Sequence, residues 1–383
     1  MKKDEIIGAF RKYFTGNARV FSAPGRVNLI GEHTDYNGGF VFPMALEYST
    51  LVAVSPRDDR KVNLLSVDMD SSITFSLDDN QKKRDHWSDY TAGVARMLEL
   101  EGIHLPGADM LISSSVPVGA GLSSSAAIEI SSALAFLSTA GKEMPNAELA
   151  LLGQRAENRF VGMNCGIMDQ FISVCGEKDR ALFLDCRSLD YRQVPLPSDK
   201  VKIVICNTMV KHQLGTSEYN KRRAECEEGV RILKTDYPQV QALRDVTIDE
   251  FKKSESSLPE VVRKRCRHVI SENKRVLDSI EALDKKDLEL FGRLMNSSHE
   301  SLKTDYEVSC PELDQMVALA HRLHGCLGAR MTGGGFGGCT VNLVLNEAAD
   351  DFRLEISRFY EDATGIKPEV YISSPSQGAH EIA

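Results

Sequence analysis

The chain has 383 residues, which is more than one hydrophobic core usually supports, so we expect two domains. Its fractions of hydrophobic (42%) and charged (26%) residues are ordinary for a globular protein. A net charge of -9 argues against nucleic acid or an anionic membrane as the main partner.

The first half of the chain predicts helices and strands in a mixed order. Residues 3–15 have the apolar spacing of a short amphipathic helix. Strand patterns follow at 18–22, 50–56, 62–67, 73–77, 108–114 and 181–184, and helical patterns at 86–100, 124–137 and 146–161. The periodicity weakens at 191–200, where two prolines stand, and we place the boundary between an N-terminal lobe (1–195) and a C-terminal lobe (196–383) there.

The second half predicts a strand at 201–207 and a highly charged helix at 217–233. Residues 252–297 are mostly charged helix with the apolar spacing of a solvated bundle face, and they support no functional claim. A short buried strand at 341–345 and a helix at 351–364 complete the pattern. The sum is an α+β protein with two lobes.

The first motif, residues 25–39 (GRVNLIGEHTDYNGG), combines four glycines with Arg26, Glu32, His33 and Asp35. Charged groups this close together resist burial unless they are paired. They suit a polyhydroxylated ligand, whose hydroxyls need both hydrogen-bond donors and acceptors. The alternative is a surface loop with a helix cap and scattered charges.

The serine loop, residues 117–127, places Gly119 and Gly121 before Ser123, Ser124 and Ser125 at the start of an apolar helix. A helix N-terminus has unpaired N–H groups and the positive end of the helix dipole, so it suits a phosphate. A serine hydroxyl there can also reach a magnesium ion bound to the phosphates. The alternative is a plain serine N-cap. The GxxxxGK[ST] phosphate loop is absent.

The glycine loop, residues 332–338, contains a GxGxxG pattern at Gly333, Gly335 and Gly338. A strand pattern follows it, whereas a dinucleotide-binding motif requires a helix, so that interpretation fails. We expect a backbone loop that closes against the phosphate side of a site. A tight turn with a bulge is the alternative.

Two acidic residues are candidates for catalysis or metal binding. Glu157 lies on the polar face of a predicted helix, and Asp169 lies among apolar residues, where a carboxylate needs a cationic partner or a role. A solvated helix residue and a helix N-cap are the respective alternatives. Tyr219 has the pattern of a surface helix residue. His321 and His324 have HxxH spacing without a third ligand nearby, so no metal site is expected there.

Cysteine usage and the first residues indicate the compartment. The nine cysteines are an odd number without a CxxC pair, which argues against a disulfide framework. The start, MKKDEIIGAF, is too charged for a signal peptide, and no run of about 18 apolar residues predicts a transmembrane helix. We therefore expect a cytoplasmic location.

The three motifs in this order resemble the GHMP family of small-molecule kinases. The first motif, together with CGIMDQF, LDCRS and TSEYNKRR, resembles the members that phosphorylate galactose. The resemblance runs from about residue 20 to the C-terminus. It implies an N-terminal α/β lobe like domain 2 of ribosomal protein S5, a C-terminal ferredoxin-like α+β lobe, and a site in the cleft between them.

The resemblance also implies a reaction, in which ATP phosphorylates the anomeric hydroxyl of α-D-galactose to give galactose 1-phosphate and ADP, the first step of galactose breakdown. Asp169 would accept the hydroxyl proton, and Arg26 would pair with Asp169 and stabilise the moving phosphoryl group. Sugar binding would fall to Glu32, His33, Thr34, Asp35, Gly166 and Tyr219. The nucleotide would contact Ser66, Gly119, Ala120, Gly121, Leu122, Ser123, Ser124 and Ser125, and Mg2+ would be bound by Ser125 and Glu157.

Two other functions remain open at this point. The chain could phosphorylate a related sugar, N-acetylgalactosamine or an arabinose, or it could be a galactose sensor without turnover. The intact GLSSSAA segment argues against the sensor. The expected partners are galactose and ATP, with no nucleic acid and no membrane, and the expected state is a monomer or a weak homodimer.

Overall fold

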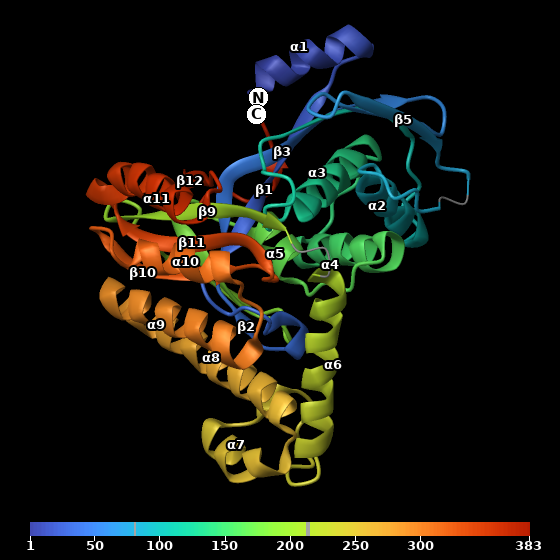
Figure 1. Cartoon of the computed structure of the whole chain (residues 1–383). Coiled ribbons are helices and arrows are strands. Elements are labelled where there is room, and N and C mark those ends of the chain that lie inside the picture. Colours follow the sequence, from blue (N-terminus) through green and yellow to red (C-terminus); the bar gives the residue numbers. More distant parts are fainter. Residues whose placement is uncertain (80–81, 212–214) are drawn as a thin grey trace.

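Two lobes, each with its own β-sheet, form the computed structural model, which describes residues 1–79, 82–211 and 215–383 (Figure 1). The first sheet has six strands in the order β13-β1-β3-β6-β4-β5, and the second has four in the order β10-β11-β9-β12. A further sheet has the order β2-β7-β8. No helix among the described residues combines the length and the apolar character that crossing a membrane requires.

The first lobe is a sheet covered by helices on both faces. Its strands are β1 (Arg19–Asn28), β3 (Pro43–Arg57), β4 (Lys61–Ser66), β5 (Ser71–Ser76), β6 (Gly107–Ser114) and β13 (His380–Glu381). Helices α2 (Asp89–Leu100), α3 (Ser124–Thr139), α4 (Asn146–Ala156) and α5 (Met168–Cys175) share one apolar cluster with Val52 and Val54. Leu51 and Ala53 point to the opposite face, where they pack with α1 (Lys3–Tyr13), as strand alternation requires.

The second lobe is ferredoxin-like. Its strands, in chain order, are β9 (Val201–Lys211), β10 (Cys326–Thr332), β11 (Gly337–Leu345) and β12 (Glu369–Ser373), and their spatial order is that of the ferredoxin-like fold. Helices α10 (Pro311–Ala320) and α11 (Ala349–Thr364) pack on one face of this sheet. The other face joins α9 (Leu288–Ser301) and the first lobe in one apolar cluster, so the lobes share a core.

The remaining elements lie beside or between the sheets. The small sheet consists of β2 (Phe40–Val41), β7 (Arg180–Asp185) and β8 (Tyr191–Pro195). Helices α6 (Gly215–Leu233), α7 (Ile248–Ser254) and α8 (Glu260–Asp284) extend away from the second sheet (Figure 1). Short 3-10 turns are η1 (Asp35–Asn37), η3 (Leu243–Asp245), η4 (Glu255–Ser257) and η6 (Asn346–Ala348), and π turns are η2 (Glu157–Val161) and η5 (Leu302–Tyr306).

The structure confirms the expected strands and most helices, changes three predicted segments and adds elements that were not expected. The strand expected at 18–22 continues to Asn28, and the helix expected at 146–161 changes to a π turn at Glu157. The 191–200 segment contains β8, which pairs with β7. Helices α5 and α10 and strand β10 lacked a clear periodicity and were not expected, because each is short and mostly buried.

Helix α8 is the largest departure from the sequence prediction. A solvated helix face was expected there, but several polar residues of α8 are buried. Three of its polar side chains hydrogen-bond the first motif and the residue after it. Glu272 accepts from Gly31 N at 2.9 Å, Asn273 Oδ1 accepts from Phe40 N at 2.9 Å, and His268 Nε2 lies 3.1 Å from the carbonyl of Glu32. The polar residues of α8 therefore satisfy backbone groups of a buried loop.

Glu272 is a fully buried carboxylate, so its charge must be compensated. Its side chain accepts from Arg275 Nε and from Ser298 Oγ, each at 2.6 Å. Burial would raise the pKa of Glu272, but Arg275 and His268 outweigh it and lower the pKa to about 2. This depressed pKa means that the ionised form stabilises the folded state.

We expect Glu272→Gln to lower the free energy of unfolding at neutral pH by about 3 kcal/mol, because Arg275 then lacks its carboxylate. The wild-type carboxylate contributes fully above its unfolded pKa near 4.5, and the contribution disappears as the pH falls toward about 2. Urea unfolding should therefore show the difference between wild type and variant narrowing below about pH 4.5.

The matched control is Glu281→Gln, which removes an exposed carboxylate from the same helix and breaks its pair with Lys285. Its free energy of unfolding should stay close to that of the wild type. The free energy of unfolding of Glu272→Gln could instead differ from that of the wild type by the same amount from neutral to acid pH. That result would contradict the conclusion that Glu272 is ionised in the folded protein.

Candidate functional site

A cavity of about 260 Å³ lies where the first motif, the turn before α5, helix α6 and the glycine loop meet. These segments come from both lobes, and most of the side chains in the cavity wall are polar. The lining residues are Arg26, Glu32, His33, Asp35, Tyr36, Gly162, Met163, Asn164, Cys165, Gly166, Met168, Asp169, Tyr219, Asn220, Gly333, Gly334, Gly335 and Phe336.

An ion pair between Arg26 of β1 and Asp169 of α5 forms one wall of this cavity. Arg26 Nε donates to Asp169 Oδ1 at 2.8 Å, and Arg26 Nη2 donates to Oδ2 at 2.6 Å. Ser123 Oγ also donates to Oδ2, at 2.5 Å. The Asp169 side chain keeps 23% of its surface exposed, so the carboxylate remains accessible from the cavity. The cationic partner expected for Asp169 is therefore Arg26.

Arg26 is itself buried and links the ion pair to the serine loop. Its Nη1 donates to the carbonyl of Gly121 at 2.6 Å, and its backbone N donates to the carbonyl of Leu122 at 3.0 Å. Burial acts to lower the pKa of Arg26, but the charge of Asp169 outweighs it and the pKa is raised. The guanidinium thus stays charged beside Asp169.

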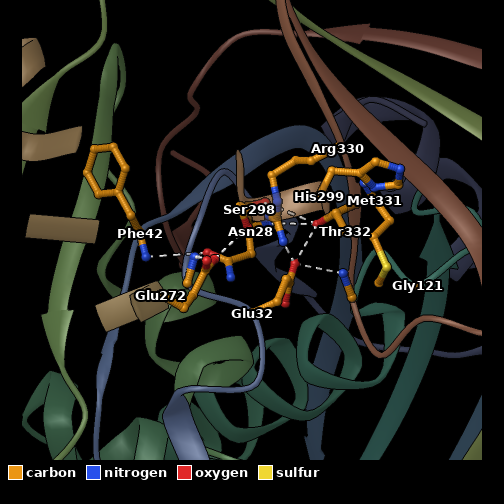
Figure 2. Close-up of polar contacts among 12 residues, drawn as sticks. Asn28, Glu32, Phe42, Gly121, Glu272, Ser298, His299, Arg330, Met331 and Thr332 are labelled. Atoms are coloured by element: carbon orange, nitrogen blue, oxygen red, sulfur yellow. Dashed lines mark hydrogen bonds and ion pairs between the residues drawn. The ribbon is translucent and has the colours of Figure 1, made fainter. Parts of the chain in front are cut away.

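Glu32 is fixed in the cavity wall by donors from the second lobe (Figure 2). Its Oε1 accepts from Gly333 N at 2.8 Å and from Thr332 Oγ1 at 3.1 Å, and Arg330 Nη1 lies 3.4 Å away. Arg330 is fully buried and also donates to the carbonyl of Asn28 at 3.0 Å. Strand β10 therefore orients a carboxylate that belongs to the first lobe.

His33 has the strained left-handed backbone that functional sites often contain, with φ of 61°. Its Nδ1 lies 2.8 Å from the hydroxyl of Tyr36, whereas its buried Nε2 has no hydrogen bond of normal geometry among the described residues. Burial and the nearby His268 lower the pKa of His33 to about 3, so the ring is neutral. A buried ring nitrogen without a partner in a cavity wall suits a polar ligand.

Asp35 and Gly166 approach each other so closely that only glycine fits at position 166. A Cβ atom there would overlap Asp35 Oδ2. Burial, followed by the charge of Asp169, raises the pKa of Asp35 to about 7. The fold therefore brings Asp35 and Gly166 into contact, although they lie far apart in the sequence.

Tyr219 lies in the cavity wall, whereas Thr34 lies outside it. Tyr219 lines the cavity, with its ring centroid 5.6 Å from that of His33, so the interpretation as a surface helix residue is wrong. Thr34 is fully buried outside the cavity wall, and its hydroxyl donates to the carbonyls of Gly31 (2.8 Å) and Phe40 (2.6 Å). Thr34 therefore fixes the loop from which its neighbours extend.

The serine loop turns sharply before α3, with positive φ at Gly119 (72°), Gly121 (77°) and Ser123 (58°). Ser123 is the N-cap, and Ser124 and Ser125 begin the helix, so N–H groups without helical acceptors are available there. The glycine loop and β11 lie against this turn, since Cys339 Sγ donates to the carbonyl of Ala120 at 2.9 Å. As expected, a strand follows the glycine loop, and that loop closes against the serine loop.

Ser66 lies away from the cavity lining, at the end of β4. It is paired in register with Ile112 of β6, the strand that leads into the serine loop. The structure therefore brings Ser66 to the same end of the sheet as the serine loop.

Glu157 is buried at the start of the π turn η2, so the interpretation as a solvated helix residue is wrong. Gln170 Nε2 donates to Glu157 Oε2 at 2.7 Å and to Glu129 Oε2 at 3.0 Å. Burial, followed by the charge of Asp169, raises the pKa of Glu157, and the nearby hydroxyl of Ser125 acts to lower it. A hydroxyl and a carboxylate side by side are oxygen ligands of the kind that Mg2+ prefers.

These two side chains form only a partial metal site. The described residues contain no cluster of three or more His, Cys, Asp or Glu side chains able to bind an ion. Mg2+ sites commonly use one or two protein ligands and complete their shell with substrate phosphates and water. Ser125 and Glu157 fit that pattern.

Sequence reasoning missed several residues that shape the site. Arg330, Glu272 and Tyr306 do not belong to the three motifs, and their contacts join segments far apart in the chain. One signal could have identified Arg330, because it is a charged residue in an apolar strand directly before the glycine loop. Glu272 and Tyr306 carried no comparable signal.

Known protein families and structures match the chain along most of its length. Residues 8–56 match the galactokinase galactose-binding signature, residues 89–177 the N-terminal domain of GHMP kinases, and residues 279–362 the C-terminal domain of GHMP kinases. The crystal structure of Lactococcus lactis galactokinase complexed with galactose superposes with a TM-score of 0.95 at 37% identity, covering 99% of each chain. Methanococcus jannaschii mevalonate kinase shares the fold, with a TM-score of 0.67 at 22% identity over 95% of this chain and all of that one.

Curated relatives agree with these matches. A galactokinase of Roseiflexus sp. is 49% identical over 95% of this chain and 93% of its own length. A galactokinase of Chloroflexus aggregans is also 49% identical, over 94% of this chain and 93% of its own. The chain therefore belongs to the galactokinases, within the GHMP kinase family.

Proposed function

We propose that this protein transfers the γ-phosphoryl group of ATP to the anomeric hydroxyl of α-D-galactose, giving galactose 1-phosphate and ADP. As a GHMP kinase the chain uses ATP as its phosphoryl donor. The observation that carries the proposal is the Asp169 carboxylate, which faces the cavity while Arg26 and the serine loop hold it from behind. The galactose complex of the Lactococcus lactis relative supports the choice of sugar.

Sugar binding falls to polar groups of the cavity wall. Glu32 and Asp35 accept hydrogen bonds from sugar hydroxyls, and His33 and Tyr219 bond further oxygens. The backbone at Gly166 lets the sugar approach Asp35. Thr34 acts indirectly by fixing the loop.

Phosphoryl transfer requires mainly positioning and charge neutralisation. The anomeric oxygen forms a bond to the γ-phosphorus as the bond to the ADP oxygen breaks, and Asp169 accepts the hydroxyl proton. Arg26 keeps Asp169 ionised and stabilises negative charge on the moving group. Both groups are placed by hydrogen bonds before the substrates arrive.

The serine loop contacts the phosphates of ATP. Backbone N–H groups from Gly119 to Ser124 donate to phosphate oxygens at the positive end of α3, and this stretch comprises Gly119, Ala120, Gly121, Leu122, Ser123 and Ser124. Ser66 contacts the nucleotide beyond the phosphates. Ser125 and Glu157 would hold Mg2+, and the bound ion would neutralise charge on the ATP phosphates.

Three further features of the protein complete the proposal. We propose a cytoplasmic location, which the nine free cysteines support. The division into lobes at residues 195 and 196 falls between β8 and β9. A monomer or weak homodimer without nucleic-acid or membrane partners stays a prediction.

We expect galactose to give the highest kcat/KM when galactose, N-acetylgalactosamine and arabinose are compared in a coupled ADP-release assay. A higher value for another sugar would assign the chain to a different sugar 1-kinase. Binding of galactose by calorimetry without ADP release from any sugar would indicate a sensor.

We expect Asp169→Asn to lower kcat by about 1,000-fold, because the amide cannot accept the hydroxyl proton. Galactose binding, measured by calorimetry, should persist, since the sugar keeps its other contacts. Asp109→Asn is the matched control. Asp109 lies in β6, outside the cavity lining, and accepts a hydrogen bond of 2.8 Å from Arg57. Turnover of Asp169→Asn within tenfold of the wild type would be incompatible with the assigned role.

We expect Ser125→Ala to raise the Mg2+ concentration for half-maximal activity by about tenfold, because one oxygen ligand is lost. The galactose dissociation constant should stay unchanged. Ser131→Ala, which removes a hydroxyl bonded to the carbonyl of Ala127 in the same helix, should alter neither quantity. If Ser125→Ala raised the half-maximal Mg2+ concentration and the galactose dissociation constant by the same factor, Ser125 would not be a metal ligand.

A further inference from the structure

A buried polar cluster lies beside the cavity, within the first lobe. Gln170 of α5 is completely buried, and its Nε2 donates to Glu157 Oε2 at 2.7 Å and to Glu129 Oε2 at 3.0 Å. Glu129 of α3 is also completely buried, and Glu157 begins the π turn η2 after α4. Helices α3, α4 and α5 pack in one apolar cluster (Figure 1). One amide group therefore bonds carboxyl groups from two other elements.

The two contacts determine how the Gln170 amide is turned. Each of its two N–H groups meets one carboxyl oxygen, and a carboxyl oxygen can accept whether or not the acid is ionised. With the amide reversed, its oxygen would face two acidic oxygens, and both Glu129 and Glu157 would have to hold a proton. The amide nitrogen therefore belongs on the side of the two carboxyl groups, and Gln170 acts on them as a donor.

Glu129 is an unusual residue for its position. It does not line the cavity, and among the residues that the structure describes its Oε1 has no hydrogen-bond partner. A buried carboxyl group with only one satisfied oxygen costs stability, so an apolar side chain would suit a purely structural position better. The bond from Gln170 is the contact through which Glu129 can act on the site.

The bond from Gln170 fixes one oxygen of the Glu157 carboxylate. Cys165 Sγ lies 3.4 Å from the same oxygen, Oε2, so both donors approach one side of the group. A thiol is a weak donor, and Cys165 Sγ also lies 3.3 Å from Asn158 Oδ1. Gln170 is therefore the stronger support, and Glu157 can offer its other oxygen, Oε1, to a metal ion.

The same helices carry this cluster and the proposed reacting groups. Ser125 and Glu129 are four residues apart in α3, so they lie on the same face of that helix. Asp169 and Gln170 are consecutive in α5, where Asp169 lines the cavity and Gln170 does not. The helix that carries the proposed proton acceptor thus also supports the proposed metal ligand, Glu157.

We propose that Gln170 is a positioning residue that holds the Glu157 carboxylate in the orientation required for Mg2+, and that Glu129 fixes the Gln170 amide by accepting its second N–H. Metal ligands are commonly oriented by such outer hydrogen bonds, and losing one typically costs about 10- to 100-fold in metal affinity or activity. Neither Gln170 nor Glu129 touches the ion itself. This inference rests on the Mg2+ ligands proposed above.

Gln170→Met tests this role, because methionine fills a similar volume without an N–H donor. We expect the dissociation constant of Mn2+ in the presence of a non-hydrolysable ATP analogue, measured by electron paramagnetic resonance on the full chain, to rise about tenfold. The analogue alone, in EDTA, and galactose should bind as they do to the wild type. Wild-type Mn2+ affinity, or equal losses in all three affinities, would refute the proposal.

Glu129 provides a second pair of variants, which carries the test if Gln170→Met does not fold. Glu129→Gln keeps an oxygen that can accept from Gln170, so its Mn2+ affinity should stay within twofold of the wild type. Glu129→Leu removes this acceptor, and we expect the Mn2+ affinity to fall about threefold. Equal Mn2+ affinities in these two variants would overturn the proposal.

The control is Gln193→Met, which removes an amide that donates to the carbonyl of Cys175 at 2.6 Å, at the other end of α5. It should change none of these affinities. Ser125→Ala separates this inference from the proposed function. If Ser125→Ala leaves the Mn2+ affinity unchanged, the proposed metal site and this inference both fail. If Ser125→Ala weakens Mn2+ binding and Gln170→Met does not, the role of Gln170 alone is wrong.

Discussion

The burial of one guanidinium group constrains the centre of this molecule. Arg26 is almost inaccessible to solvent, and a buried charge is tolerated only with a partner of opposite charge and satisfied hydrogen bonds. Asp169 supplies the charge, and the carbonyl of Gly121 takes a remaining N–H. These contacts fix β1, α5 and the serine loop relative to one another. The group that receives a proton and the loop that contacts phosphate are therefore placed by the same side chain.

The second lobe contributes more to the sugar site through support than through direct contact. Glu272 bonds the backbone of Gly31, Arg330 bonds Glu32, and Tyr306 bonds Tyr36. The first motif has too many polar groups to form a stable loop alone, because its buried backbone and charges need partners. Those partners come from α8, β10 and η5, which lie more than 200 residues further along the chain.

The sequence was sufficient for the fold class and for the charged residues of the cavity, because dense charges beside glycines mark them locally. It was not sufficient for Glu157, Tyr219 and Thr34. Glu157 and Tyr219 have ordinary helical surroundings in the sequence. The packing of other elements buries Glu157 and places Tyr219 in the cavity wall. Whether Thr34 binds the sugar or stabilises its own loop depends on which carbonyls lie near its hydroxyl, and the sequence does not show this. Such facts arise from tertiary contacts rather than from local pattern.

The pairing of β13 with β1 bears on how the protein forms during synthesis. The last residues return to the first lobe, where Ile382 N bonds the carbonyl of Val20 and Gly378 N bonds that of Gly176. A ribosome makes these residues after the whole second lobe. The first lobe therefore cannot complete its sheet until the second lobe has been synthesised, although its other strands can pair earlier. In topological terms, the second lobe is an insertion within the first.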